Sequence, residues 1–232
     1  MWPNHLMGWP KYLLSVFWNE FSTLQKQKMK AVTKSVIYWS CFFIVLCMVS
    51  CTHVVNPSLT TKPYPKQQKL DLSAILLLPA SLHSAKIENN LAGDNWVILL
   101  GDSLIRNSRG LVEGLFAHAS SVDEGTEVIE KNADIVLVPR LVTAQSAHAV
   151  WRYDESTVTL AIEWTAKDNN GNVILVDTVK GEGKSAGGSG FAAKDDVEKR
   201  VNTALARLFL NSYKTLYESP VLKLIEKRKR KL

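Results

Sequence analysis

The chain has 232 residues, 46% of them hydrophobic and 22% charged, which is typical of a globular protein with one medium-sized domain. Its formal net charge of +6 comes from five basic residues and one acid in residues 1–50 and from six basic residues and one acid in residues 223–232, which leaves residues 51–222 at −3. This charge distribution, a mildly acidic domain with one basic tip, excludes a nucleic-acid-binding protein, which would carry a broad basic face. The tip can still contact an anionic surface.

The first 50 residues divide at Met29. Residues 1–28 are rich in aromatic side chains and do not fit a signal peptide, so we expect an extra or wrongly assigned extension and Met29 as the true start. The alternative is a functional aromatic-rich N-terminal helix. Residues 29–50 fit a signal peptide, because a basic start precedes the fifteen uncharged residues Val36 to Ser50. This run is shorter than the roughly 20 residues of a membrane-spanning helix.

The uncharged run ends in Met48-Val49-Ser50-Cys51, which resembles the lipobox of bacterial lipoproteins. The resemblance implies that the Cys51 sulfur receives a diacylglyceryl group, that the chain is cut before Cys51 and that the new amino group is acylated, for example by palmitate. Two or three acyl chains together form a stable membrane anchor. The alternative is a plain transmembrane anchor in which Cys51 stands by chance.

The residue after Cys51 bears on the choice of membrane. By resemblance to bacterial lipoproteins, an Asp at this position tends to retain the protein in the inner membrane, and this chain has Thr52 instead. The sequence therefore predicts an outer-membrane location, lipid-anchored on the periplasmic face.

Cysteine and proline usage describe the chain on either side of the predicted cleavage. Cys41 and Cys47 would leave with the signal peptide, so the mature chain keeps only Cys51 and forms no internal disulfide. Residues 51–71 contain three prolines among polar residues and are predicted to be the lipidated cysteine followed by an extended, proline-rich tether.

Residues 72–220 carry the pattern of one α+β domain. Continuous or alternating apolar runs predict five strands, at residues 72–80, 95–101, 133–142, 157–164 and 173–179. Asn and Gly in residues 168–172 predict a hairpin turn between the last two. Apolar residues at helical spacing predict one helix from Leu104 to about Ser120 and another from about Asp195 to Pro220. We expect a mainly antiparallel sheet of about five strands with two amphipathic helices packed on one face, followed by a basic C-terminal tail at 221–232.

A small α+β domain behind a lipobox and a proline-rich tether is similar to the accessory lipoproteins of the bacterial envelope, a class that includes activators of penicillin-binding proteins and lipopolysaccharide-assembly lipoproteins. The similarity implies a non-enzymatic domain that faces the periplasm and binds an envelope protein or peptidoglycan.

The letters GDSL at residues 101–104 offer an enzymatic alternative. In GDSL serine hydrolases the serine likewise follows a strand at the start of a helix, so Ser103 could be the nucleophile of an esterase with His118 or His148 as its base. The Asp-x-x-His and Gly-x-Asn-Asp blocks of that family are absent. We therefore expect Asp102 or Ser103 to cap the helix and the protein not to be an enzyme.

Three further motifs predict neither a cofactor nor a metal. The glycine-rich residues 181–190 match neither a P-loop nor a dinucleotide-binding turn in context and are expected to be a flexible loop or a strand end. The acidic residues of 123–130 lack the spacing of a calcium loop. Trp151 to Tyr153 are expected to pack at an edge strand, with an exposed glycan- or protein-binding patch as the alternative.

Overall fold

In a computed structural model the chain forms two compact units, Met1–Ser50 and Cys51–Leu232. The structure describes residues 52–58, 68–91, 94–125, 133–147, 156–185 and 194–231, all in the second unit. The predicted extension and signal peptide lie outside the described residues. The boundary between the units falls at the bond where the lipobox predicts cleavage.

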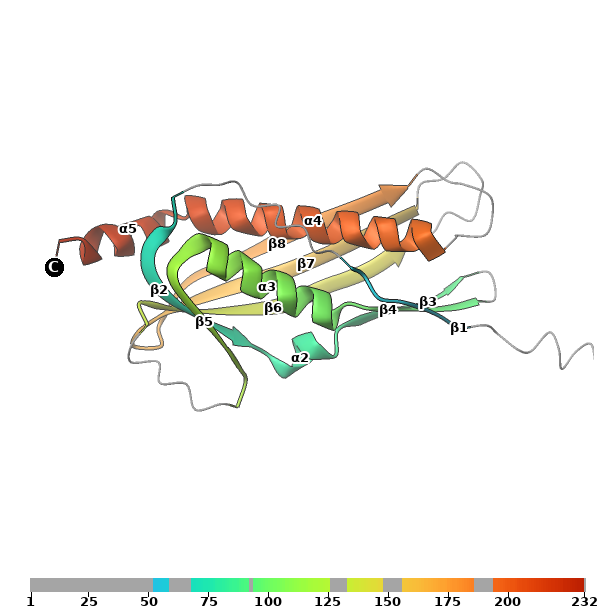
Figure 1. Ribbon diagram of the computed structural model, residues 1–232, viewed down its shortest axis with the longest axis horizontal. Helices are drawn as coiled ribbons and strands as arrows, with labels where there is room; N and C mark the ends of the chain where they lie inside the picture. The colour runs from blue at the N-terminus through green and yellow to red at the C-terminus, as the bar shows by residue number, and fades with distance from the viewer. Residues whose placement is uncertain are drawn as a thin grey trace, which may run out of the picture. The chain divides into compact units, whose positions relative to one another are not determined.

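A five-stranded sheet in the order β5-β2-β6-β7-β8 forms the centre of the described unit (Figure 1). β2 (Leu70–Leu78) runs parallel to both β5 (Phe116–Asp123) and β6 (Ile135–Ala147). β6, β7 (Ser156–Asp168) and β8 (Val173–Ser185) form an antiparallel meander that contains most of the paired residues. The α+β class and the mainly antiparallel pairing are thereby confirmed.

The turn between β7 and β8 follows the sequence prediction. Gly171 has a φ of +81°, which glycine adopts without the strain that a side chain would add. The Asp168 carboxylate accepts hydrogen bonds from the backbone N–H groups of Asn170, at 2.9 Å, and Asn172, at 2.8 Å. Such side-chain-to-backbone bonds stabilise a tight turn locally.

A second, three-stranded sheet has the order β1-β4-β3. β1 (Thr52–Val55) runs parallel to β4 (Asp94–Leu99), and β3 (Lys86–Leu91) runs antiparallel to it. The residues of β1 were expected to be part of the tether. Proline begins only at Pro57, however, and the four residues Thr-His-Val-Val before it are of types that favour a strand.

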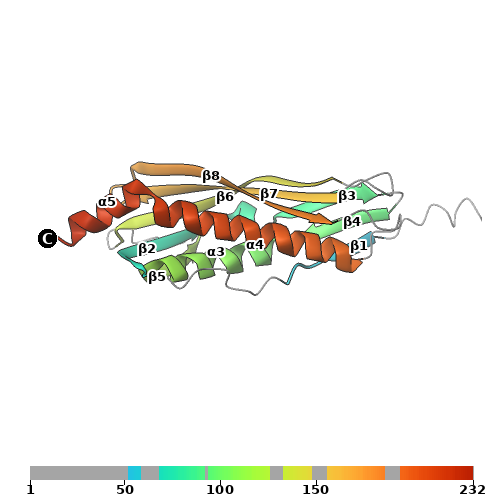
Figure 2. The same cartoon turned by 90° about the horizontal axis from the view of Figure 1, so that it is seen from above.

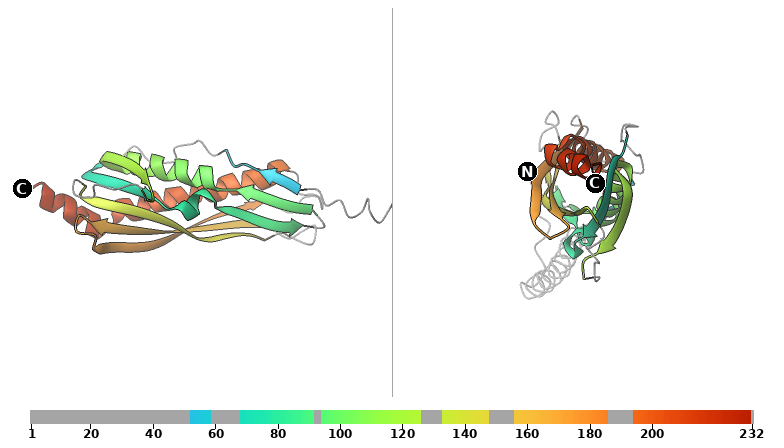
Figure 3. Two further views of the ribbon diagram at one scale, coloured as in Figure 1. Left: turned by 90° about the horizontal axis from the view of Figure 1, so that it is seen from below. Right: turned by 90° about the vertical axis from the view of Figure 1, so that its left-hand side faces the viewer.

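Two amphipathic helices, α3 (Gly101–Leu115) and α4 (Lys194–Glu218), lie side by side on one face of the five-stranded sheet (Figures 2 and 3). This arrangement confirms the prediction. A short helix, α2 (Ala80–His83), follows β2, and α5 (Pro220–Lys229) follows α4. Among the described residues no helix is long and apolar enough to span a membrane.

The core lies between the helices and the sheet. Trp164 on β7 is fully buried, and its indole N–H donates to the Ser212 hydroxyl on α4 at 2.9 Å. β8 presents Gly181 and Gly183 to α4, where an added Cβ on Gly183 would lie 1.9 Å from the Arg200 carbonyl oxygen. The glycines of this segment therefore let a helix backbone approach the strand, and residues 181–185 are the end of a strand.

The first predicted helix was placed too far along the chain. α3 ends at Leu115, and the next residues, Phe116 to Ser120, belong to β5. Phe116 and Ala119 continue the helical spacing of apolar residues, but Phe116 is buried in the sheet at a position paired with Leu70. β5 gave no strand signal because most of its side chains are small, polar and exposed.

The residues predicted to be a basic tail form α5. Pro220 occupies the first turn, and the Ser219 hydroxyl accepts a hydrogen bond from the Leu222 backbone N–H at 3.5 Å. Proline at this position and a serine cap are the usual start of a helix, so the chain breaks after α4 and begins a new helix at once.

Candidate functional site

The GDSL letters lie at the start of α3, but neither Asp102 nor Ser103 caps the helix. α3 begins at Gly101, and the backbone N–H groups of Leu100 and Gly101 both donate to the Ala85 carbonyl, at 2.9 and 3.1 Å. The cap prediction is wrong, because no side chain in the described structure accepts a cap hydrogen bond from α3. The Ala85 carbonyl, between α2 and β3, binds the backbone at the helix start instead.

The glycine of the motif is explained by packing. A Cβ added at Gly101 would lie 2.1 Å from the His83 carbonyl oxygen, so only glycine lets the start of α3 contact the end of α2. Asp102 is exposed in the first turn, where a negative charge is favourable, and Leu104 is fully buried.

Ser103 attaches the segment after β1 to α3. Its side chain is 1% exposed, and its hydroxyl donates to the Pro57 carbonyl at 2.6 Å. His118 lies on the exposed part of β5, and His148 lies outside the described residues. No observation supports the esterase alternative. Within the described ranges, no group of three or more His, Cys, Asp or Glu side chains could hold a metal ion.

The described part of the acidic segment contacts the rest of the domain. Asp123 lies 3.3 Å from the His83 imidazole and 3.9 Å from the Arg109 guanidinium. The Glu124 carboxylate accepts a hydrogen bond from the Ala80 N–H at 3.0 Å. Glu127, Glu130 and the Trp151–Tyr153 segment lie outside the described residues.

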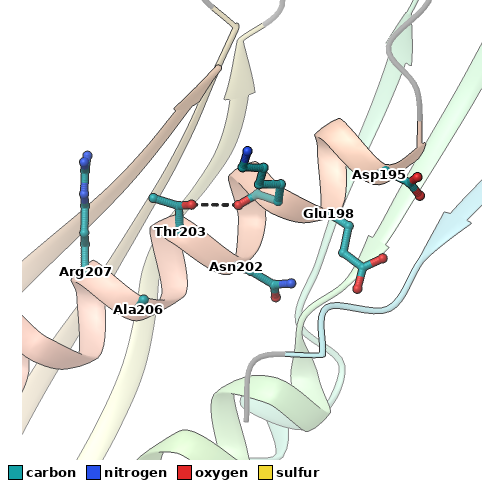
Figure 4. A pocket seen from close by; sticks show the side chains of 7 residues that line it. Asp195, Glu198, Asn202, Thr203, Ala206 and Arg207 are labelled. Atoms are coloured by element: carbon teal, nitrogen blue, oxygen red, sulfur yellow. Dashed lines mark hydrogen bonds between the residues drawn. The ribbon is translucent and has the colours of Figure 1, made fainter. Parts of the chain in front are cut away.

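One shallow groove of about 560 Å³ runs along the exposed face of α4 (Figure 4). Its lining is Asp195, Glu198, Lys199, Asn202, Thr203, Ala206 and Arg207. Glu198 accepts a hydrogen bond from the Ser58 hydroxyl at 3.0 Å, and Arg207 donates to the Glu182 carbonyl at 2.9 Å. Both charges therefore attach α4 to neighbouring segments.

Arg200 on α4 is a buried cation that the sequence did not reveal. It is 2% exposed, and burial lowers the pKa of its guanidinium, although the Asp196 carboxylate opposes the shift. Its Nε donates to the Asp196 carbonyl at 3.2 Å, whereas its Nη1 has no hydrogen-bond partner within the described part of the chain. Val197, Val201 and Ala204 surround it in the helical pattern, so only an apolar face could be expected there.

We call the start of β1 and the strand ends beside it the proximal end of the domain. Thr52 is paired with Asn95, and the His53 ring stacks on Trp96 with centroids 4.5 Å apart. Val55 is fully buried. The first described residues are thus built into the domain.

α5 lies at the other end of α4, which we call the distal end. It is attached to the beginnings of β2 and β6 in the five-stranded sheet. Lys229 Nζ lies 2.8 Å from the Asp134 carboxylate, which also accepts hydrogen bonds from the Ser73 N–H and hydroxyl. Partial burial by itself raises the pKa of Asp134, but the bonds from Lys229 and Ser73 outweigh it and hold that pKa below its usual value. The Glu226 carboxylate accepts from the Asp71 N–H at 3.0 Å.

The remaining surface of the distal end is both basic and apolar. Lys227, Arg228 and Lys231 are exposed and form no ion pair with another described residue. Leu224 on α5 is 49% exposed, and Val173 and Val176 at the start of β8 are 56% and 53% exposed. Figure 2 shows the start of β8 at the same end of the domain as α5. We refer to these six residues as the distal surface.

The free edge of β8 is covered along only part of its length. Arg207 and Asn211 on α4 donate to the carbonyls of Glu182 and Lys180, at 2.9 and 3.0 Å. Helix side chains that cover a strand edge prevent pairing with another chain. No such bond from α4 reaches residues 173–178 in the described structure, so this part of the edge is open.

No family model matches the chain, and no curated protein matches it significantly. Similar solved structures include protein XCC0632 from Xanthomonas campestris, with a TM-score of 0.48, 13% identity, and 77% of this chain and 99% of that chain covered. A minor lipoprotein from Acinetobacter baumannii has a TM-score of 0.39 and 14% identity, with 62% and 92% covered. Lipoprotein GNA1162 from Neisseria meningitidis has a TM-score of 0.29 and 12% identity, with 49% and 84% covered. Several similar structures are thus lipoproteins, but at these identities no residue role carries over to this chain.

Proposed function

We propose that this protein is a lipoprotein of the bacterial envelope, anchored by lipids on Cys51. The observation that carries the proposal is Met48-Val49-Ser50-Cys51 at the end of a signal-peptide-like run. The division of the chain into compact units at Ser50 and Cys51 supports it, because cleavage there would release the second unit whole. Thr52 at the next position favours the outer membrane, with the domain facing the periplasm.

The domain acts as a non-catalytic binding module in this proposal. The Ser103 hydroxyl, the one nucleophile that the sequence suggested, is buried and bonded to a backbone carbonyl. The distal surface, by contrast, combines exposed valine and leucine side chains with exposed lysine and arginine side chains. Such a surface fits an envelope protein with an apolar contact region and nearby acidic groups, and peptidoglycan is the alternative partner.

Metabolic labelling with a radioactive fatty acid tests the anchor. Cys51→Ser should abolish the label and leave a longer, uncleaved precursor, because a serine hydroxyl is too weak a nucleophile to take the diacylglyceryl group. Cys47→Ser is the matched control, since Cys47 leaves with the signal peptide and its loss should change neither label nor size. Label that persists on the Cys51 variant would contradict the proposal.

Affinity capture from detergent-solubilised envelopes tests the binding role. Replacing Lys227 and Arg228 by glutamate should lose a specific partner, whereas Lys214→Glu, an exposed change on α4, should retain it. A partner that binds the parent, the double variant and the Lys214→Glu protein equally would exclude the distal surface as its binding site. Purified peptidoglycan sacculi, added in place of the solubilised envelope, distinguish the two classes of partner.

A further inference from the structure

The position of β1 relative to the predicted lipid anchor determines how the domain meets the membrane. β1 begins at Thr52, the residue after Cys51, and four consecutive residues pair with β4, from Thr52 with Asn95 to Val55 with Ile98. Consecutive Cα atoms are about 3.8 Å apart, so the lipidated residue lies one peptide bond from a strand of the domain.

Contacts beyond the strand also fix this segment. Pro57 is buried, and its carbonyl accepts a hydrogen bond from the Ser103 hydroxyl of α3 at 2.6 Å. The Ser58 hydroxyl donates to Glu198 in the first two turns of α4 at 3.0 Å. Residues 52–58 therefore contact three elements of the domain and do not act as a tether.

The two ends of the domain are separated by the length of α4. The segment after β1 contacts α4 at Glu198, and α5 begins at Pro220, two residues after Glu218, the last residue of α4. The 25 residues of α4 span about 37 Å at 1.5 Å per residue. Figure 1 shows β1 and α5 at opposite ends of α4.

We propose that the proximal end rests directly on the membrane that holds Cys51 and that α5 points away from it. The inference depends on the lipid anchor proposed above. The surface in contact with the lipid headgroups is formed by Thr52 and, paired with it on β4, by Asn95. The cations of α5 are held at the far end, where they face a partner and not the anionic lipids of the same membrane.

The chemistry of the proximal end suits this contact. Thr52 and Asn95 are exposed, uncharged and polar, so they can exchange hydrogen bonds with headgroups without requiring lipids of one charge. The contact is thus imposed by the covalent anchor, and it should not weaken with salt as binding by α5 to anionic lipid would.

Energy transfer to the membrane tests the orientation. The processed lipoprotein carries its one cysteine sulfur as a thioether, so a single new cysteine can be labelled with a fluorescent donor. Asn95→Cys marks the proximal end and Leu224→Cys marks α5, and both side chains are exposed. The labelled proteins are reconstituted into vesicles of phosphatidylethanolamine and phosphatidylglycerol that contain a headgroup-linked acceptor.

We expect transfer from the Asn95 label to exceed that from the Leu224 label by at least about twofold, since a separation of about 37 Å is comparable with usual transfer distances. The ratio should persist at high salt. As a control, about 20 Gly and Ser residues inserted between Cys51 and Thr52 should remove most of the difference, because a flexible linker lets the domain reorient.

Two results would overturn the proposal in distinguishable ways. Equal transfer from the two labels, or stronger transfer from Leu224, in a protein that floats with the vesicles would contradict the orientation alone. A protein that does not float with the vesicles would contradict the lipid anchor itself, and the orientation with it.

Discussion

The Ser103 hydroxyl on α3 donates a 2.6 Å hydrogen bond to the Pro57 carbonyl, in the segment that follows β1. Both residues are buried, so removal of the donor leaves a carbonyl without water or protein partner. Ser103→Ala should lower the free energy of unfolding by about 1–3 kcal/mol. Ser103→Asp should cost more, because a carboxylate only accepts hydrogen bonds and would face a carbonyl oxygen in a buried site.

Urea denaturation of residues 52–232 measures these differences. Asp102→Ala, one residue earlier and exposed, is the control and should cost only about 0.3–1 kcal/mol through the lost charge at the helix start. A Ser103→Asp protein as stable as the parent would contradict a stabilising role for the Ser103–Pro57 hydrogen bond.

Gly183→Ala tests the close packing of β8 against α4. The new Cβ would lie 1.9 Å from the Arg200 carbonyl oxygen, so the helix must shift, and we expect a loss of about 1–3 kcal/mol of unfolding free energy. Gly110→Ala, inside α3, has no atom within 4 Å of the new Cβ and should instead gain about 0.5–1 kcal/mol. The thermal unfolding midpoints of the two variants should therefore shift in opposite directions from that of the parent. A shift in the same direction would contradict the close packing of β8 against α4.

The ion pair between Lys229 and Asp134 should make stability depend on pH in the acid range. The pKa of Asp134 in the folded protein is below the usual value of 3.8, so the carboxylate stabilises the fold above that value and loses this contribution as pH falls through its folded pKa. Asp134→Asn should thus be less stable than the parent near neutral pH, and the difference should shrink below about pH 4.

Unfolding midpoints measured from pH 2.5 to pH 7 follow this dependence. Lys229→Met removes the cation but keeps the carboxylate. The pKa of Asp134 should then rise toward its usual value but stay below it, because the Ser73 hydrogen bonds remain. A difference between Asp134→Asn and the parent that stays constant over the whole range would exclude the ion pair as its source.

The purified domain should not hydrolyse short-chain esters above the rate of buffer alone. The Ser103 side chain is 1% exposed, and its hydroxyl donates a hydrogen bond to the Pro57 carbonyl. No base in the described structure is bonded to it. A burst of product with an acyl group on Ser103, detected by mass spectrometry, would contradict this expectation.

Local patterns predicted the part of the fold built from local contacts. The alternation from Val158 to Trp164 and the turn at 168–172 predicted two strands of the meander, and the helical spacing after Asp195 predicted α4. β5 escaped prediction because its mostly exposed, polar side chains show no alternation. β3 escaped prediction because Ile87 is a single buried apolar residue between the charged residues Lys86 and Glu88.

The parts that sequence reasoning missed depend on residues far apart in the chain. The start of α3 donates hydrogen bonds to the Ala85 carbonyl, and α5 is attached by Asp71 and Asp134. No pattern around Ser103 or Lys229 contains these partners, so capping chemistry and charge alone predicted a side-chain cap and a free tail. The lipobox, a motif read as contiguous letters, needs no such partner and stays a prediction of the sequence.

The attachment of α5 also has a consequence for the order in which the protein folds. The bond from the Asp71 N–H to Glu226 joins residues 155 positions apart, and that from Lys229 to Asp134 joins residues 95 positions apart. Contacts of this range form late, since the loop between them must close first. The attachment of α5 to β2 and to the start of β6 is thus expected to form after neighbouring strands have paired. A chain truncated after Glu218 would keep all eight described strands but would leave the Asp134 carboxylate and the site of the buried Leu222 open to solvent and to proteolysis.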